Sequence, residues 1–226
     1  MIPIKVRQPS YSTPVVTICL IVVNVLIFLY EFWLGLVDPY TLNRFMDVYS
    51  LRPAYFSFTN VFTAMFVHAN WMHVLGNMLF LWVFGDNVED ILGHGKYLIF
   101  YLACGVAAAM AQVAMDPSSR VPMVGASGAI AGVMGAYFVL YPRSRVLTLI
   151  PWIFIQVVEL PATVLLGFWF LMQLVNAGAI AATASMRGSG GVAFAAHVAG
   201  FVVGAAAIFV FRRRDRDYWD QASYYS

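Results

Sequence analysis

Long apolar runs separated by short polar stretches recur along the chain, which has 226 residues. A helix needs about 20 apolar residues to cross a bilayer; five runs qualify or nearly qualify, and a sixth lies close to the C-terminus. The six predicted spans cover residues 15–37, 68–85, 96–115, 126–141, 161–182 and 191–211. The pattern therefore predicts an all-α membrane protein, built as a bundle of six transmembrane helices.

Two connecting stretches need a separate interpretation. Residues 146–158 are apolar but are interrupted by Pro151. At about 1.5 Å per residue, a helix of this length is too short for a hydrocarbon core of about 30 Å, so we expect an interfacial or re-entrant loop. The connection at residues 38–60 is long and rich in aromatic side chains. Structureless loops of that length are uncommon, so we expect short helices packed partly into the outer leaflet.

The composition changes this picture little. Hydrophobic residues make up 62% of the chain and charged residues 11%, which is typical of a polytopic membrane protein surrounded by a lipid bilayer. No basic patch with interleaved aromatic residues indicates a nucleic-acid partner. Cys19 and Cys104 both fall inside apolar spans, where small apolar packing is expected rather than a disulfide.

The positive charges predict the orientation. Six spans put nine Lys and Arg residues on one side: Lys5, Arg7, Lys96, Arg143, Arg145, Arg212, Arg213, Arg214 and Arg216. The other side then carries four, namely Arg44, Arg52, Arg120 and Arg187. Because the excess marks the cytoplasmic side, both termini are expected in the cytoplasm. Residues 1–14 would be a short cytoplasmic segment, residues 15–211 the six-span domain and residues 212–226 a charged cytoplasmic tail.

Five polar side chains fall where the bilayer makes them costly, and such groups are functional candidates. They are His68, His73, Asn77, Ser127 and His197. They belong to the second, fourth and sixth spans, each of which begins on the outer side in the six-span topology. We therefore expect the five side chains to lie at one level, a short distance below the outer surface.

Small residues would allow the fourth and sixth spans to approach closely. The glycines involved are Gly128, Gly132 and Gly135 in one span and Gly200 and Gly204 in the other. Their packing is expected to bring His197 within reach of Ser127. His73 and Asn77 share one helical face and could donate hydrogen bonds to an oxyanion, together with N–H groups at the start of the fourth span. The set comprises a nucleophile, a base and an anion-binding pocket.

Two other kinds of site fit the sequence poorly. A metal site is not expected, nor any cofactor, because His68 and His73 lack the H-E-x-x-H spacing and no acid or cysteine is expected at their level. The nucleophile elbow of soluble hydrolases needs a strand before the serine, which an all-helical chain lacks. The acids at the far end of the second span are expected to be solvated or to cap a helix, with His94 exposed beside them. These acids are Asp86, Glu89 and Asp90.

Three stretches resemble the signatures of the rhomboid intramembrane serine proteases. They read H-A-N-W-M-H-V-L-G-N at 68–77, G-A-S-G at 125–128 and H-V-A-G-F-V-V-G at 197–204. The turn V-E-D-I-L-G-H-G-K at 88–96 is also similar to that family, and the resemblance extends over residues 15–211. It implies Ser127 as nucleophile and His197 as general base. It also implies an oxyanion hole of His73, Asn77 and the Ser127 N–H, with Gly125 shaping the turn and His68 supporting loop and water structure.

The chain departs from the family pattern at two places. The Trp-Arg pair of the first outer loop is replaced by Leu51-Arg52-Pro53, and Ala131 stands where some members have an aromatic residue that stacks on the base. Another group must therefore orient His197. Since no carboxylate is expected at the depth of the serine, a two-residue Ser-His catalytic unit is predicted.

The expected activity is cleavage of transmembrane segments of membrane proteins near the extracytoplasmic face. The compact form and the absence of a transit peptide indicate the plasma membrane of a prokaryote. The fifth span, with Pro161 and Gly167 and the linker 185–191 after it, is the expected gate. Two alternatives stay open: an inactive rhomboid-like protein that binds membrane segments, and a transporter that uses the histidines as a proton relay.

Overall fold

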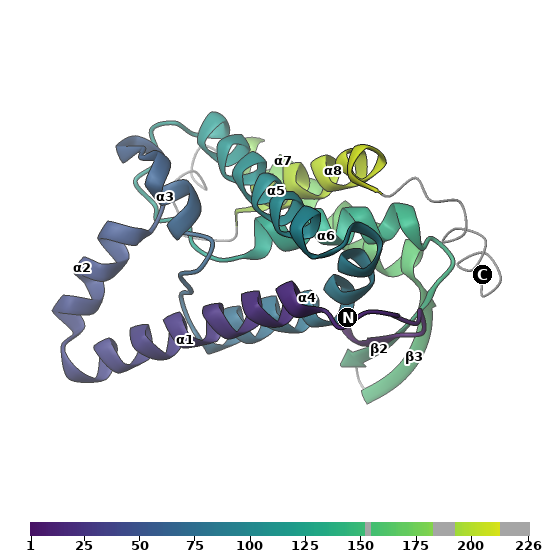
Figure 1. Cartoon of the computed structure of the whole chain (residues 1–226). Helices are drawn as coiled ribbons and strands as arrows, with labels where there is room; N and C mark the ends of the chain where they lie inside the picture. Colours follow the sequence, from purple (N-terminus) through teal and green to yellow (C-terminus); the bar gives the residue numbers. More distant parts are fainter. Residues whose placement is uncertain (152–154, 183–192, 213–226) are drawn as a thin grey trace.

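The computed structural model describes residues 1–151, 155–182 and 193–212, and within them the chain is mostly helical (Figure 1). The α-helices are α1 (Val15–Val37), α2 (Pro39–Tyr49), α3 (Phe58–Thr63), α4 (Trp71–Leu92), α5 (His94–Met115), α6 (Ser127–Leu140), α7 (Ala162–Ala182) and α8 (Phe194–Phe211). A short 3-10 turn, Pro53–Tyr55, lies between α2 and α3. The predicted linker 185–191 and most of the predicted tail lie outside the described residues.

Each predicted span contains a helix, but the number that crosses a membrane is not confirmed as six. Within the described residues, four helices are long and apolar enough to cross by length and composition: α1, α5, α7 and α8. Helix α4 has 22 residues but carries three acids near its end, and α6 has only 14 residues. The chain is a membrane protein with several apolar helices.

The prediction of an all-α fold is confirmed only in part, because the described chain is mostly helical but also forms a three-stranded antiparallel sheet. Its strands are β1 (Ile2–Val6), β2 (Arg145–Pro151) and β3 (Ile155–Pro161), in the order β1-β2-β3. Most of the apolar piece that we expected to be an interfacial or re-entrant loop is therefore a β-hairpin. Val146 and Thr148 of β2 are buried on one face, as the alternation of a half-buried strand requires. An ion pair between Arg7 and Glu159 joins the two outer parts of the sheet.

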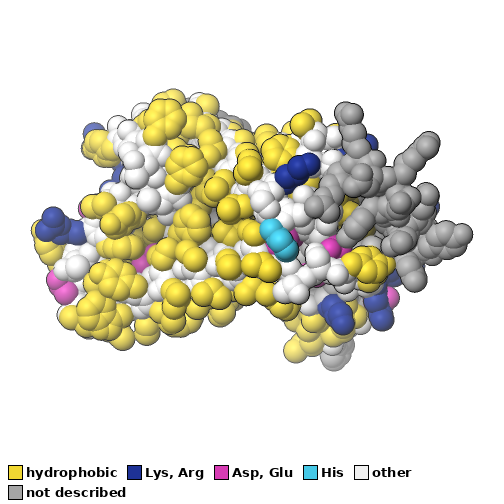
Figure 2. Space-filling view, in the orientation of Figure 1, with side chains coloured by type: hydrophobic (Ala, Val, Ile, Leu, Met, Phe, Trp, Pro, Cys, Tyr) yellow, Lys and Arg dark blue, Asp and Glu magenta, His cyan; other side chains and the backbone are white. Residues whose placement is uncertain are grey.

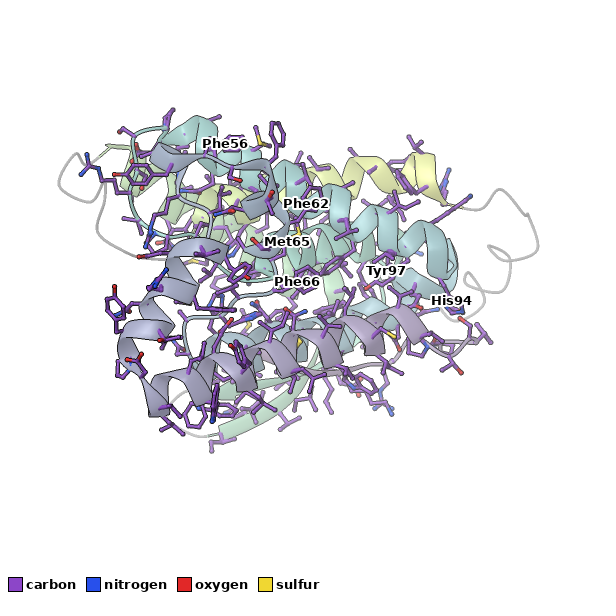
Figure 3. The ribbon with its side chains drawn as sticks, turned by 60° about the vertical axis from the view of Figure 1, so that its left-hand side comes forward. Phe56, Phe62, Met65, Phe66, His94 and Tyr97 are labelled. Carbon is purple, nitrogen blue, oxygen red and sulfur yellow. The ribbon has the colours of Figure 1, made fainter. Side chains whose placement is uncertain are left out.

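The connection between α1 and α4 contains short helices, as predicted. The side chain of Asp38 caps α2 by accepting a hydrogen bond from the Tyr40 N–H at 3.0 Å. Further along, Met65 packs with Val61 and Ala109 of α5 in a small apolar cluster. Figure 3 shows Phe62, Met65 and Phe66 in this part of the molecule, with His94 toward the opposite end. We call this side the α2–α3 end, and the side with the β-sheet the sheet end.

Helix α6 is the centre of the molecule and packs against α4, α5, α7 and α8. Its residues 129–137 are all buried. Helices α6 and α8 touch through their backbones: a Cβ added at Gly200 would overlap the carbonyl of Gly128, and one at Gly204 would overlap Gly132. The predicted close approach of the two spans is therefore confirmed, since only glycine fits at these contacts.

Charged and apolar side chains are separated on the surface. Figure 2 shows hydrophobic side chains over the middle of one face, with Lys and Arg mainly toward its two ends. The sheet end carries Lys5 and Arg145 on paired strands, and the α2–α3 end carries Arg44 and Arg52. Large apolar side chains of α1 are exposed along its length, including Leu26, Leu29, Trp33 and Leu36. Such a surface suits lipid rather than water.

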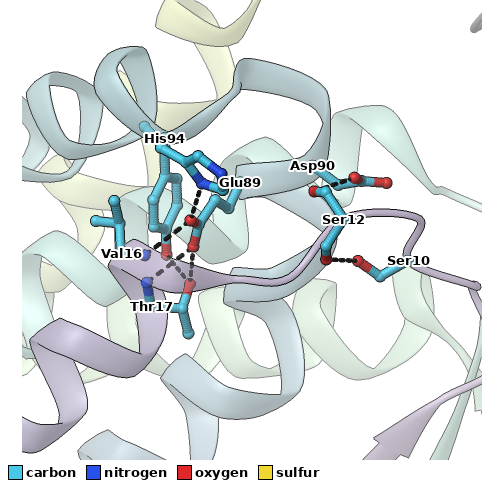
Figure 4. A network of polar contacts seen from close by, with 8 residues as sticks. Ser10, Ser12, Val16, Thr17, Glu89, Asp90 and His94 are labelled. Carbon is cyan, nitrogen blue, oxygen red and sulfur yellow. Dashed lines mark hydrogen bonds and ion pairs between the residues drawn. The ribbon is translucent and has the colours of Figure 1, made fainter.

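Glu89, one of the three acids at the end of α4, caps another helix, which was one of the two predicted alternatives (Figure 4). Glu89 is fully buried and accepts hydrogen bonds from the N–H groups of Val16 and Thr17, each at 2.8 Å. Helix α1 follows Pro14 and has no capping side chain of its own, so Glu89 supplies the missing acceptor from α4. His94 is exposed, as expected, and contacts Glu89 at 2.6 Å.

Candidate active site

Ser127 and His197 face each other at the α2–α3 end of the helices. The Ser127 Oγ lies 2.7 Å from the Nε2 of His197, within hydrogen-bond distance. Ser127 is the first residue of α6, and His197 lies in the first turns of α8, where it is 8% exposed. The backbones of α6 and α8 are in contact close to this pair. The side chains of Ser127 and His197 are therefore long enough to meet.

The turn before Ser127 depends on Gly125. Its φ angle is +109°, a region that side chains with a Cβ rarely adopt. A Cβ at this position would also lie 2.6 Å from the Nε2 of His73 and 3.3 Å from the Nδ2 of Asn77. Glycine therefore allows the chain to pass closely beside both side chains and to present Ser127 at the start of α6.

His73 and Asn77 of α4 lie beside this turn, on one face of their helix. The Asn77 Nδ2 donates to the Nε2 of His68 at 2.9 Å, and the Nδ1 of His68 lies 3.3 Å from the carbonyl of Phe66. The rings of His68 and His73 meet edge to face, with centroids 5.1 Å apart. The hydrogen bond to His68 thus occupies one N–H of the Asn77 amide. The second N–H can donate to a group in the space beside Gly125. The structure brings all five predicted polar side chains together.

A carboxylate lies at this level, although the sequence predicted none. Glu31 of α1 is 3% exposed, and its Oε2 accepts a hydrogen bond from the backbone N–H of His68 at 3.1 Å. Its Oε1 has no hydrogen-bond partner among the described residues. The acid stands six residues before the end of α1 at Val37, next to the segment from which His68 reaches Asn77. Counting residues back from the outer end of the first span would have found it.

The group that orients His197 comes from α7 and was also missed. The Nδ1 of His197 lies 2.8 Å from the Oε1 of Gln173, which is 9% exposed. The ring of Trp169, one turn earlier on α7, lies 5.7 Å from the imidazole with an interplanar angle of 36°. Ala131 is fully buried and contacts α8 near Gly200 instead. A lone glutamine four residues after a tryptophan in an apolar run was the available signal.

The other departure from the expected pattern has a simple structural replacement. Leu51, at the start of the Leu51-Arg52-Pro53 stretch, is fully buried and forms an antiparallel bridge with Met123. The two backbone hydrogen bonds of this bridge measure 2.8 and 3.0 Å. The first loop is therefore joined by its backbone to the segment that leads into Gly125 and Ser127.

The arrangement holds a hydroxyl, a base and several hydrogen-bond donors in one place. The first N–H groups of α6 have no partner within their helix, and the helix dipole favours negative charge at this end. Within the described part of the chain, no three His, Cys, Asp or Glu side chains are grouped so that they could hold a metal ion. Such a site can activate a hydroxyl and stabilise an oxyanion.

The family model and the similar proteins all indicate the same family. Residues 55–214 match the family model of the Rhomboid domain. The chain is 28% identical over 197 residues to "Rhomboid-like protein 11, chloroplastic" of Arabidopsis thaliana, covering 80% of this chain and 65% of that protein. It is 29% identical over 110 residues to "Rhomboid protein 1, mitochondrial" of Saccharomyces cerevisiae, covering 46% and 32%. It is 39% identical over 74 residues to "Rhomboid protease GluP" of Bacillus subtilis, covering 33% and 14%. The chain spans less than two thirds of each relative.

Proposed function

The chain belongs to the rhomboid family, and from that premise we propose that it is an intramembrane serine endopeptidase with a Ser127–His197 catalytic pair. The observation that carries the proposal is the 2.7 Å contact between the Ser127 Oγ and the His197 Nε2, in a partly buried site between α6 and α8. A serine hydroxyl is a weak nucleophile unless a base within hydrogen-bond reach removes its proton. This contact supplies that base.

The proposed reaction has two halves. Ser127 attacks the carbonyl carbon of the scissile peptide while its proton moves to the Nε2 of His197. The tetrahedral intermediate collapses when the C–N bond breaks, and His197 gives the proton to the leaving amine. A water molecule then attacks the acyl-enzyme, with His197 again taking and returning the proton. General base catalysis of this kind contributes about 10²- to 10⁴-fold to the rate.

Negative charge on the substrate oxygen would be stabilised by His73, Asn77 and the N–H of Ser127. The proximity of His73 and Asn77 to Gly125 supports this role, because the oxyanion forms next to the attacking serine. His68 supports it indirectly, since its hydrogen bond fixes the amide of Asn77. Preorganised donors of this kind cost no rearrangement when the charge develops.

The substrates we propose are transmembrane segments of membrane proteins, cut near the extracytoplasmic face. Two features support this: the site lies at the α2–α3 end, and most of the described Lys and Arg residues belong to the sheet end. The charge excess would place the sheet end and both termini in the cytoplasm, with six membrane-spanning helices. The plasma membrane of a prokaryote remains our proposed location; the compared relatives include chloroplastic, mitochondrial and bacterial proteins.

The direct test is cleavage of a fluorescent transmembrane segment by the purified protein in liposomes. We expect the wild type to cut it, and mass spectrometry of the products to place the cut toward one end of the segment. Ser127→Ala should show no cleavage above background while it keeps the helix content and unfolding midpoint of the wild type. A wild type that binds the segment without cutting it would contradict the proposal and favour an inactive, binding relative.

A further inference from the structure

His197 makes hydrogen bonds through both ring nitrogens, and the second partner comes from a different helix. We propose that Gln173 of α7 is the positioning residue for His197, so that the catalytic group is a Ser127–His197–Gln173 relay. This inference rests on the proposed function, and it extends it by naming the group that prepares the base. Its observation is the 2.8 Å contact between the His197 Nδ1 and the Gln173 Oε1.

The contact selects one form of the imidazole. A neutral histidine carries its proton on either Nδ1 or Nε2, and only the Nδ1–H form leaves Nε2 free to accept the proton of Ser127. The Gln173 Oε1 is an acceptor, so it pairs with Nδ1–H and disfavours the other form. The same bond fixes the rotation of the ring, which keeps Nε2 directed at the Ser127 Oγ, 2.7 Å away.

A neutral acceptor suits a site at this depth. In soluble serine proteases a buried carboxylate takes the corresponding place. An ionised carboxylate facing a neutral imidazole would be a buried, unpaired charge, which is costly in a medium of low polarity. The amide of Gln173 gives the same direction of hydrogen bonding without a net charge. His73 of α4 is also close enough to His197 to interact with it electrostatically, and a neutral Gln173 adds no further charge to this group.

Aromatic side chains near Gln173 pack α7 against α8. Trp169 and Gln173 lie four residues apart and share the face of α7 that meets α8. The ring of Phe170 stacks on Phe201 with centroids 4.6 Å apart, and Trp169 lies 6.1 Å from the same ring. Phe201 follows His197 by one turn on α8. The base is therefore carried by α8 but oriented by α7, and its orientation depends on the seating of α7 against α8.

The activity test compares Gln173→Leu with a matched control on the same helix. Leucine has a similar volume and cannot accept a hydrogen bond, while Met172→Leu changes the neighbouring, exposed side chain. We expect Gln173→Leu to lower kcat on the transmembrane substrate by about 10- to 100-fold, part of the contribution of base catalysis, with little change in KM. Met172→Leu should match the wild type in both constants.

Gln173→Glu is the conservative variant that separates positioning from packing. Its carboxylate can accept the Nδ1–H bond, so cleavage should recover to within about tenfold of the wild type at alkaline pH. An anionic acceptor stabilises the imidazolium, so the acid limb of the pH profile should move to higher pH. His73 is the same in every variant and contributes equally to all the profiles. A purely packing role would leave the position of the acid limb unchanged.

A readout that needs no activity uses ¹⁵N-labelled histidine. NMR of the ring nitrogens in detergent micelles, with the His197 signals assigned from His197→Ala, should show the Nδ1–H form in the wild type and in Met172→Leu. Gln173→Leu should show a mixture of both forms. A wild type in the Nε2–H form, or a Gln173→Leu variant with unchanged kcat and ring signals, would overturn the inference. A wild type that cleaves nothing but shows the expected shift would overturn the proposed protease activity alone.

Discussion

Helix α4 carries a buried polar cluster at each end, and the two clusters differ in kind. At the sheet end, the capping cluster comprises Glu89, Asp90, Thr17 and His94, in which carboxylates accept hydrogen bonds from the first backbone N–H groups of α1 and from nearby side chains. At the α2–α3 end, the serine cluster comprises Ser127, His197, Gln173, His73, Asn77 and His68, in which side chains mainly bond to other side chains.

This difference indicates a structural role for the capping cluster and a chemical role for the serine cluster. In the capping cluster Glu89 has both oxygens occupied by fixed donors, so it stabilises the meeting of α1 and α4 and has little capacity to react. In the serine cluster the groups are a hydroxyl, imidazoles and amides whose donors are only partly used. Buried polar groups that are fully satisfied strengthen a fold, whereas partly used ones can bind a reacting group. Mutations in the capping cluster should therefore lower mainly the stability, and mutations in the serine cluster should lower mainly the rate of cleavage.

The largest effect on activity, after loss of the nucleophile, is expected from His197→Ala. Without the base, the rate of cleavage should fall by about 10²- to 10⁴-fold or below detection. The unfolding midpoint should change less than in Glu89→Ala, because the partners of the His197 ring are the side chains of Ser127 and Gln173 rather than backbone N–H groups of another helix. Single-turnover cleavage and unfolding in mixed SDS micelles measure the two quantities. An unfolded His197→Ala protein would contradict this expectation, since it would show that the serine cluster is needed for the fold.

Glu89→Ala should produce the largest effect on stability. It leaves the buried N–H groups of Val16 and Thr17 without an acceptor, and each such group costs about 1–3 kcal/mol. We expect the free energy of unfolding to fall by about 2–5 kcal/mol, measured in the same SDS titration. The fraction that remains folded should cleave with the kcat of the wild type. A selective loss of kcat with unchanged stability would contradict the structural role of this cluster.

Asn77→Ala should slow the reaction without ending it. Removal of one oxyanion donor typically lowers kcat by about 10²- to 10³-fold, and Ser127 and His197 remain in place. The loss should appear in kcat rather than KM, because the oxyanion forms only after attack. Steady-state kinetics on the transmembrane substrate measure it. A change confined to KM would assign Asn77 to substrate binding and remove it from the oxyanion hole.

The smallest effect is expected from His94→Ala, which sharpens the comparison within the capping cluster. The His94 side chain is 52% exposed, whereas Glu89 is completely buried. Exposed ion pairs contribute about 0–1 kcal/mol, so stability should fall by less than about 1 kcal/mol with unchanged cleavage. Should His94→Ala destabilise the protein as much as Glu89→Ala, the backbone N–H groups of α1 would not be the main partners of Glu89.

The sequence predicted the serine cluster better than its surroundings. Hydrophobic runs gave the helices, and counting depth from their ends placed Ser127 and His197 at one level, with glycines to bring them together. The sheet was missed because the pairing of β1 with β2 joins segments far apart in the chain, and local hydrophobicity carries no sign of such pairing. The expectation of a loop at residues 146–158 was wrong for a different reason, because β2 and β3 are neighbours in the chain and the short apolar run with Pro151 was interpreted from its length as a helix too short to span.

Glu31 and Gln173 were missed for a different reason. Each is a single polar residue in an apolar run, and the direction in which it points depends on which helix packs beside it. The burial of Glu89 was hidden in a similar way, since its partners are backbone N–H groups of another helix, which no residue type identifies. Polar residues within spans are therefore better assigned after the helix neighbours are known.

We propose that His197 makes Ser127 an activated nucleophile. The most direct measurement treats the protein in liposomes with a serine-directed fluorophosphonate probe and locates the label by peptide mass spectrometry. We expect labelling of Ser127 in the wild type, strongly reduced labelling in His197→Ala and none in Ser127→Ala. Absence of label on Ser127 in the wild type, or equal labelling of Ser127 in His197→Ala, would contradict it.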